Sequence, residues 1–307
     1  MTEVNGWRMG VWVRVLGAAA GGGFPQWNCG CPRCRAVRDG SRPCRPRTQS
    51  SVAVSADYRR WFLLNASPDI RAQIESFPAL HPRGVRDSPL QAVLLTDAEL
   101  DHTLGLLLLR EAGDLEVHAT AEVHETLRGG TSLLQTLGAY ARVGWRPVAT
   151  GIEVTLADGL SYRAFGVPTD KLARFGTGEG GEGVVGYRIT DGHTGRILVY
   201  VPGAQRLTAS VLAQFEGCTC LLFDGTCWQD DELIRLGIAA KTSREMGHLP
   251  ISGPNGSLER LASLPIERKI YIHINNTNPI LLEDSPERRV VEESGLEVAA
   301  DGLEMEI

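Results

Sequence analysis

Charged side chains that directly follow buried, strand-like segments constrain the fold of this chain most. The apolar run Ala92–Leu95 predicts a buried strand, and the leucine-rich run Leu104–Leu109 predicts a packed helix. Between the two runs stand three acids and one histidine, namely Asp97, Glu99, Asp101 and His102. Carboxylate and neutral imidazole are ordinary ligands of zinc, iron and manganese, so this turn is a candidate metal site. In the alternative interpretation, Asp97 caps the helix and the other charges face water.

The rest of the chain alternates short strands with short helices. We find no linker and no repeat, so we expect one α/β domain over residues 1–307, with two halves of similar rhythm. The expected strands are Val11–Leu16, Ser50–Ser55, Arg60–Leu64, Gln91–Leu95, Leu115–Ala119, Ser161–Phe165, Val184–Thr190, Ile197–Val201, Thr219–Phe223 and Lys269–His273. The expected helices are Pro68–Ser76 with Ser67 as its N-cap, His102–Ala112, Glu122–Leu127, Leu207–Phe215, Asp230–Arg235 and Ser257–Ala262, before a closing helix and two short strands.

The composition excludes several classes of protein. With 43% hydrophobic and 22% charged residues, the chain has the composition of a soluble globular protein. A net charge of -6 speaks against nucleic acid as a partner. No apolar run is long enough to span a membrane. The apolar patch Gly10–Ala20 is interrupted by Arg14 and predicts a first strand rather than a signal peptide, so we expect a cytoplasmic protein.

Three of the seven cysteines form a compact group at Cys29, Cys31 and Cys34. In a reducing compartment this spacing predicts a structural zinc site in a loop at about residues 28–35, with a fourth ligand from elsewhere. Three free thiols are the plain alternative. A redox pair is disfavoured, because no helix pattern typical of thioredoxins follows.

Two glycine-rich segments complete the list of unusual loops. Gly17–Gly23 allows the backbone to approach a ligand or another segment closely, and it lacks the spacing of a phosphate loop. Arg174–Gly183 is polar and glycine-rich, which predicts either a mobile loop near the site or a surface excursion.

Two further strand ends carry candidate ligands. Asp224 follows one expected strand, and His273 ends another. Together with Asp101 and His102 they would supply two imidazoles and one or two carboxylates, which suits a mononuclear iron or zinc centre. His248 lies in a loop beside Gly247, where it either approaches a ligand or is a surface residue.

At these residues the chain resembles the pyrroloquinoline quinone (PQQ) biosynthesis protein B family of the metallo-β-lactamase-fold superfamily. The motifs that carry the resemblance are Gly21–Cys29, Asn65–Arg71, Asp101-His102, Asp224-Gly225-Thr226, Arg244–His248 and His273–Pro279. The resemblance implies an αββα sandwich of two packed mixed sheets flanked by helices, with the metal centre at one edge.

The first metal motif of that superfamily, His-x-His-x-Asp-His, is altered in this chain. Here the frame is Asp97-x-Glu99-x-Asp101-His102, so two histidines of one metal site are absent. The pattern predicts a single metal, which disfavours a two-metal hydroxide nucleophile. Asp101, His102 and His273 are the implied ligands, with Asp224 as a further ligand or a hydrogen-bond partner.

The resemblance implies an iron(II)-dependent hydroxylase that acts, with dioxygen, on a cross-linked glutamate–tyrosine precursor of the quinone. His248 would be the proton shuttle or a substrate contact. The expected substrate-binding residues are Arg71, Arg244, Glu99 and Asn275. A carrier that transports the quinone or its precursor, and a single-metal hydrolase, are the alternatives, and a homodimer is compatible with each.

The resemblance also bears on the cysteine site. Relatives with this fold close the three-cysteine zinc site with a histidine three residues after the position of His273. Asn276 stands at that position in this chain. The fourth zinc ligand is therefore Asn276, a water molecule or another residue such as Cys44.

Overall fold

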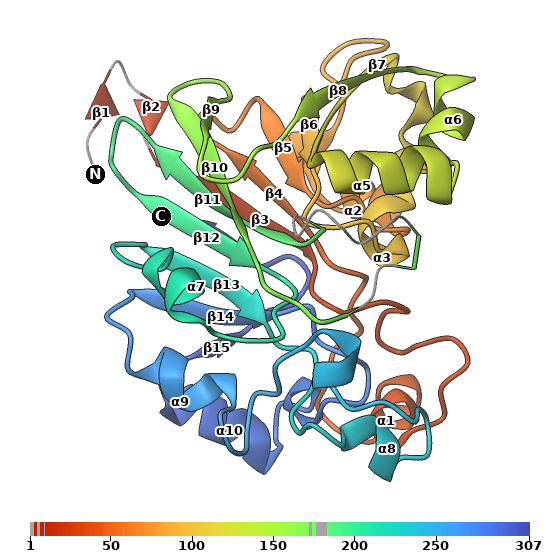
Figure 1. The fold of residues 1–307 in the computed structure, drawn as a ribbon, viewed down its shortest axis with the longest axis vertical. Helices are drawn as coiled ribbons and strands as arrows, with labels where there is room; N and C mark the ends of the chain where they lie inside the picture. Colours follow the sequence, from red (N-terminus) through yellow and green to blue (C-terminus); the bar gives the residue numbers. More distant parts are fainter. Residues whose placement is uncertain (1–2, 5–6, 9, 172–173, 176–182) are drawn as a thin grey trace.

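Two seven-stranded sheets pack face to face, and helices cover both outer faces (Figure 1). The computed structural model describes residues 3–4, 7–8, 10–171, 174–175 and 183–307. The layer order of helix, sheet, sheet and helix is the αββα sandwich predicted from the sequence, so the predicted fold class is confirmed. Within this described part of the chain, no helix is long and apolar enough to cross a membrane.

The first sheet contains most strands of the N-terminal half, and the last strand of the chain forms one of its edges. Its strands pair antiparallel from β16 to β5 and parallel from β5 to β8. In spatial order they are β16 (Glu304–Glu306), β3 (Trp12–Gly17), β4 (Ser51–Ser55), β5 (Trp61–Leu64), β6 (Leu90–Leu94), β7 (Asp114–Ala119) and β8 (Arg142–Pro147). A separate short hairpin joins β1 (Glu3–Val4) to β2 (Trp7–Arg8).

The second sheet repeats this plan with the C-terminal half. Its strands pair antiparallel from β9 to β12 and parallel from β12 to β15. In spatial order they are β15 (Glu297–Val298), β14 (Arg268–Ile272), β13 (Cys220–Asp224), β12 (Ile197–Val201), β11 (Val185–Asp191), β10 (Leu160–Gly166) and β9 (Glu153–Thr155). The similar succession of strands and helices in the two halves of the sequence therefore corresponds to two sheets with the same arrangement of antiparallel and parallel strands.

The helices are short and lie outside the sheets. On the first sheet and its connections they are α2 (Ile70–Glu75), α3 (Leu100–Thr103), α4 (Gly105–Leu108), α5 (Ala121–Glu125) and α6 (Leu133–Gly138), with the shorter turns η1 (Pro78–Leu80), η2 (Arg110–Ala112) and η3 (Thr126–Gly130). In the rest of the chain they are α1 (Pro32–Asp39), α7 (Ala209–Ala213), α8 (Glu232–Arg235), α9 (Ser257–Ala262) and α10 (Pro286–Glu293), with the turns η4 (Arg244–Met246) and η5 (Pro279–Leu281).

The main core lies between the two sheets. Leu64 and Leu94 of the first sheet meet Tyr187, Tyr200 and Leu222 of the second, and all five are buried. Such alternation of inward-facing apolar side chains is the pattern that a packed sandwich requires. The hydroxyl of Tyr187 also donates a hydrogen bond to the carbonyl of Leu95 at 2.8 Å. This contact anchors the end of β6, from which the acidic turn emerges.

The predicted helix His102–Ala112 is wrong, because the chain forms three short pieces there. Gly105 marks the break between α3 and α4, where its N–H donates to the Ala66 carbonyl at 3.0 Å. A Cβ atom on Gly105 would lie 2.2 Å from the carbonyl oxygen of Ser67. The close passage of this neighbouring segment therefore requires glycine and interrupts the helix.

Other differences concern elements without a strong apolar pattern. Helix α1 begins inside the cysteine motif and was not predicted. The helix after Ser67 begins at Ile70 rather than at Pro68. Strands β8 and β9 and helix α6 were not predicted; β8 is an edge strand whose residues are mostly exposed. Of the predicted loop Arg174–Gly183, residues 176–182 lie outside the described residues.

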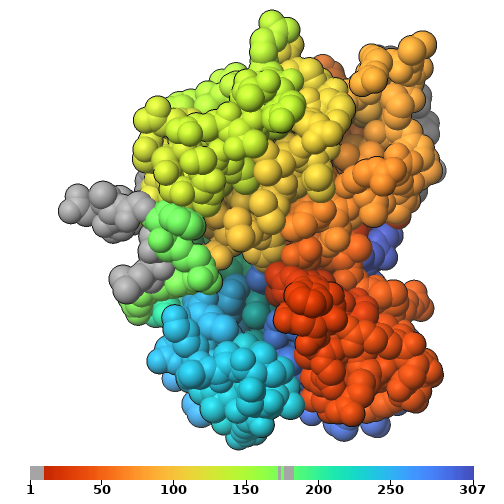
Figure 2. Space-filling view, turned by 90° about the vertical axis from the view of Figure 1, so that its right-hand side faces the viewer, coloured from red at the N-terminus to blue at the C-terminus, as the bar shows by residue number. Residues whose placement is uncertain are grey.

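Several segments distant in sequence meet on one face of the molecule. Figure 2 shows the red N-terminal part of the chain, the yellow part that follows β6 and the cyan part near residues 225–250 gathered on this face. Asp101 lies in helix α3, which follows β6, Asp224 is the last residue of β13, and His273 directly follows β14. These are the strand ends at which the sequence predicts a site.

Candidate metal centre

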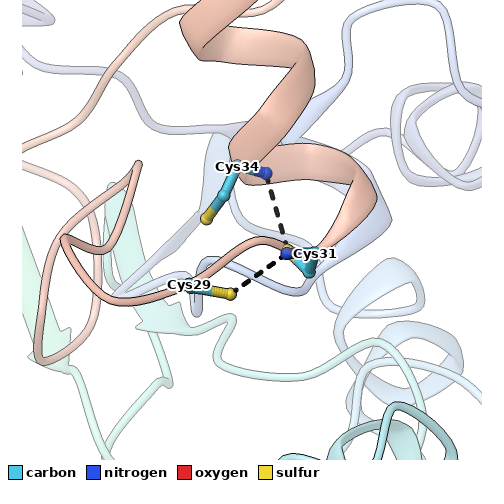
Figure 3. Close-up of side chains that lie close together, drawn as sticks. All are labelled: Cys29, Cys31 and Cys34. Atoms are coloured by element: carbon cyan, nitrogen blue, oxygen red, sulfur yellow. Dashed lines mark hydrogen bonds between the residues drawn. The ribbon is translucent and has the colours of Figure 1, made fainter.

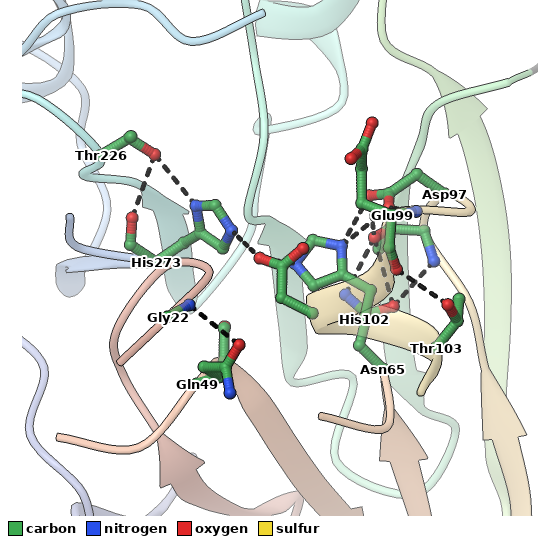
Figure 4. A network of polar contacts seen from close by, with 12 residues as sticks. Gly22, Gln49, Asn65, Asp97, Glu99, His102, Thr103, Thr226 and His273 are labelled. Atoms are coloured by element: carbon green, nitrogen blue, oxygen red, sulfur yellow. Dashed lines mark hydrogen bonds and ion pairs between the residues drawn. The ribbon is translucent and has the colours of Figure 1, made fainter. Parts of the chain in front are cut away.

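His102 is oriented by Asp97, which lies at the start of the turn after β6 (Figure 4). Both carboxylate oxygens of Asp97 lie 2.8 Å from Nδ1 of His102. Asp97 also accepts hydrogen bonds from the Glu99 N–H at 2.9 Å and from the Thr96 hydroxyl at 2.8 Å. A histidine that donates its Nδ1–H to a carboxylate presents the Nε2 lone pair to a metal. This orienting role was not predicted; the spacing of five residues between the acid and the histidine, across a helix start, is its only sequence signal.

The other nitrogen of His102 fits a metal ligand. Its Nε2 is buried and has no hydrogen-bond partner among the described residues. A buried nitrogen without a partner is unfavourable, so its presence here indicates a missing ligand. Nε2 lies 3.9 Å from Oδ2 of Asp101, and Nε2 of His273 lies 3.2 Å from the same oxygen. The ligand atoms of Asp101, His102 and His273 all lie within 4.8 Å of one another.

His273 is held in place by its backbone and by Thr226. Its φ angle is +58°, in the left-handed region that larger side chains rarely adopt. Its Nδ1 lies 2.9 Å from Oγ1 of Thr226 (Figure 4). Its Nε2 is thereby directed at Asp101. The strained turn after β14 thus brings a residue of the second sheet to ligands of the first.

Thr226 joins Asp224, His248 and His273 into a second group. Its hydroxyl donates to Oδ1 of Asp224 at 2.6 Å and lies 3.1 Å from Nδ1 of His248. The other oxygen of Asp224 accepts from the Ala204 N–H at 2.9 Å and lies 2.8 Å from Nδ1 of His248. Both carboxylate oxygens are therefore used in hydrogen bonds. The ligand atoms of Asp224, His248 and His273 also lie within 4.8 Å of one another, so His273 is common to both groups.

Charges around His102 suit the binding of a cation. Burial alone would raise the pKa of Asp97, but the neighbouring His102 lowers it to about 2. Burial would lower the pKa of His102, but Asp97 and Asp101 raise it to about 9. In the metal-free protein, two carboxylates thus stabilise one proton on His102. A metal ion at Nε2 would replace that proton.

The glycine-rich segment after β3 approaches the metal centre closely. A Cβ atom on Gly21 would lie 3.2 Å from Oδ2 of Asp101. At that distance the carboxylate would have to shift by a few tenths of an ångström to accommodate a side chain, so a residue larger than glycine would disturb Asp101. The close approach expected for this segment is to a ligand residue, and no phosphate loop is formed.

The residues expected to bind substrate lie in different environments. The carboxylate of Glu99 pairs with Lys171 at 2.7 Å and with Arg174 at 3.5 Å. Arg244 is tied to the carbonyls of Pro254 and Asn255 at 3.3 and 3.2 Å, which is a structural role. Arg71 is exposed on α2, and its side chain has no hydrogen bond or ion pair to any described residue. The side-chain amide of Asn275 donates to the Thr277 hydroxyl at 2.6 Å.

The three cysteines gather at the start of α1 (Figure 3). Their sulfur atoms lie within 4.8 Å of one another. Asn276 is next to them, because its side-chain nitrogen lies 3.3 Å from the sulfur of Cys34. Burial raises the pKa of Cys34 to about 11, so a metal ion is needed to hold it as a thiolate at neutral pH. Cys44 is outside this group and donates to the Arg42 carbonyl at 3.3 Å.

The fold and the site are those of a known superfamily. A family model described as "Beta-lactamase superfamily domain" matches residues 60–274. This span includes strands of both sheets and all residues of the two histidine-containing groups. The chain is therefore a metallo-β-lactamase-fold protein.

Longer matches narrow the family. The coenzyme PQQ synthesis protein B of Methylococcus capsulatus is 48% identical over 302 residues, which cover 95% of this chain and 99% of that protein. The protein of the same name from Ruegeria pomeroyi is 49% identical over 301 residues, covering 95% and 99%. The crystal structure of zinc-bound PqqB from Methylobacterium extorquens superposes with a TM-score of 0.88 at 43% identity, covering 96% of this chain and all of that one. The chain belongs to the coenzyme PQQ synthesis protein B family, as the sequence motifs predict.

Proposed function

We propose that this protein is a mononuclear iron(II) hydroxylase in PQQ biosynthesis, with a cross-linked glutamate–tyrosine precursor as its substrate. The observation that supports it most is the group Asp101, His102 and His273. Two histidines and one carboxylate with open positions are the ligand set of non-haem iron(II) oxygenases. The names of the relatives place them in PQQ synthesis.

The surroundings of this group favour one metal over two. Asp97 and Glu99 stand where hydrolytic relatives have histidines, and both are already engaged. Asp97 accepts from His102, and Glu99 pairs with Lys171. A second metal at Asp97 and Glu99 is therefore unsupported, which argues against a two-metal hydrolase that uses these positions.

Each residue of the centre has a defined task in this proposal. Iron(II) bound to Asp101, His102 and His273 would supply the activation of dioxygen. Asp97 and Thr226 fix the two imidazole rings. His248 is fixed through Nδ1 on Asp224, stacks on His273 at 5.2 Å between ring centroids, and retains a partly exposed side chain. Its Nε2 is thus available to accept a proton from the phenol of a substrate.

The test is a reconstitution under anaerobic conditions. Insertion of one oxygen atom into a ring C–H bond releases the other as water and consumes two electrons and two protons. The assay therefore combines protein, iron(II), the precursor and ascorbate as external reductant, and starts with dioxygen. We expect a product heavier by one oxygen atom, measured by mass spectrometry, and none from the His102→Ala variant. Absence of turnover with any metal would refute the proposal.

The same assay separates the proposal from a carrier function. A carrier would bind the quinone or the precursor with micromolar or tighter affinity, and its ligand would be unchanged in wild-type and Asp101→Ala protein alike. A single-zinc hydrolase is the other candidate, because the solved relative is described as zinc-bound. Phosphodiester and lactam substrates test that activity directly. The metal content of protein purified without added metal, as zinc alone or zinc with iron, discriminates further.

A further inference from the structure

Lys171 contacts two separate segments of the chain, each of which carries a residue of the candidate centre close in sequence. Its ammonium nitrogen is 2.7 Å from Oε1 of Glu99, which precedes Asp101 by two residues. On the other side its aliphatic part packs on Gly247, the residue before His248, where an added Cβ would lie 3.1 Å from Cδ of Lys171. Gly247 has a φ angle of +95° and no side chain, so it leaves room for the lysine.

The position of the segment that carries Lys171 agrees with these contacts. In Figure 2 the green part of the chain lies between the yellow part above and the cyan part below. The N–H of Lys171 donates to the hydroxyl of Thr169 at 3.1 Å, which fixes the backbone locally. The lysine is thus placed by contacts on both sides rather than extended freely into water.

The charges at this place do not balance. Glu99 faces two cations, because Nε of Arg174 lies 3.5 Å from its second oxygen. One carboxylate and two cations leave a formal charge of +1. The side chains of Lys171 and Arg174 are 27% and 71% exposed, so a solute can reach both. A surplus cation beside a metal centre attracts an anionic ligand and orients it.

We propose that Lys171, assisted by Arg174, binds a carboxylate of the substrate and that Glu99 positions the Lys171 ammonium. The substrate class is an amino-acid-derived phenol that carries at least one free carboxylate. This inference rests on the proposed function for the identity of the substrate. It replaces Arg71 and Arg244, because Arg244 is occupied by backbone carbonyls and no contact joins Arg71 to the centre among the described residues.

The test measures binding rather than turnover. Isothermal titration of zinc-loaded protein with the cross-linked glutamate–tyrosine precursor is compared with titration by its fully methyl-esterified form. The variants are Lys171→Met, Lys171→Arg and Arg174→Gln. Lys241→Met is the matched control, since Lys241 is an exposed lysine elsewhere in the chain. Metal content and circular dichroism verify that each variant retains its centre and fold.

We expect Lys171→Met to weaken binding of the acid on the order of tenfold, the usual effect of losing one charge-assisted hydrogen bond. Lys171→Arg should retain most of the affinity, Arg174→Gln should lose less than Lys171→Met, and Lys241→Met should match wild type. The ester should bind equally to wild-type and Lys171→Met protein.

The outcomes separate this inference from the proposed function. Equal binding of the acid to wild-type and Lys171→Met protein overturns the inference, and so does the absence of any binding to wild type. If the charge-dependent pattern appears but no metal supports hydroxylation, the carboxylate subsite stands and the proposed reaction fails.

Discussion

The hydroxyl of Thr226 contacts three residues of the candidate metal centre. It contacts Asp224, His248 and His273 at distances of 2.6 to 3.1 Å. Because a hydroxyl has one hydrogen, its donation to Asp224 leaves it an acceptor for the Nδ1–H of His273. Asp224 therefore fixes His248 directly and His273 through Thr226.

Replacement of Thr226 by valine should weaken metal binding at this centre. Valine has a similar shape but cannot accept the Nδ1–H of His273, and loss of such an orienting partner typically costs 10- to 100-fold in metal affinity. Competition with a chromophoric chelator measures the change. Thr226→Ser restores the hydroxyl and should stay close to wild type. Equal affinity in the valine variant would show that the hydroxyl does not position His273.

At the scale of residues, the sequence marks the candidate ligands more clearly than the residues that support them. An acid or a histidine that ends or follows a predicted strand is a local signal of a site. This signal marks Asp101, His102, Asp224 and His273. The support from Thr226 joins residues 47 positions apart, and no local pattern reports it. From the sequence, Asp97 occupies the position of a histidine that binds metal in the superfamily motif. In the structure its carboxylate instead orients the imidazole of His102. Which of these residues bind a metal remains a prediction.

Among the elements, the turn after β3 passes close to a residue of the candidate metal centre. Gly21 passes so close to Asp101 that an alanine Cβ would lie 3.2 Å from Oδ2. Gly21→Ala should displace the carboxylate and lower metal affinity several-fold, as measured by the same chelator competition. Gly138→Ala is the control, because nothing lies within 4 Å of a Cβ built there. An unchanged affinity in Gly21→Ala would mean that this turn moves aside freely.

The loop at α1 offers a prediction on the second metal site. Cys34→Ser should lower the zinc content by about one ion per chain and reduce the melting temperature, because structural zinc contributes to folding free energy. Metal analysis and thermal denaturation measure both effects. Cys44→Ser should leave the zinc content unchanged, since Cys44 is outside the cysteine group. Loss of zinc in that variant would identify Cys44 as the fourth ligand.

Elements were predictable where apolar periodicity is strong. The buried strands β4, β5, β12 and β13 lie within one residue of their predicted bounds, because continuous apolar runs mark them. The break at Gly105 was not predicted, since its cause is the passage of a distant segment at Ser67. Strand β8 lacked a signal because most of its side chains face solvent.

For the whole molecule, stability depends on the contact between the two sheets. Leu222 of β13 is fully buried in that contact. Leu222→Ala should lower the free energy of unfolding by about 2–5 kcal/mol, the usual loss when a buried leucine is truncated. Urea denaturation measures this value. Ile152→Ala, at a site that is 58% exposed, should change it by about 0.5 kcal/mol or less. A similar loss in both variants would contradict a core centred between the sheets.

The turn from His273 to Asn278 connects the candidate metal centre with the cysteine group, because His273 belongs to the centre and Asn276 contacts the cysteines. This arrangement affects how metal replacement is carried out. A chelator that removed zinc from the cysteines would also loosen the support of His273, so a loss of activity on chelation would report on two centres at once. Substitution with cobalt(II) distinguishes them, because thiolate-to-cobalt charge-transfer absorption arises only where sulfur is a ligand. Metal exchange followed by this absorption assigns each loss of activity to its own centre.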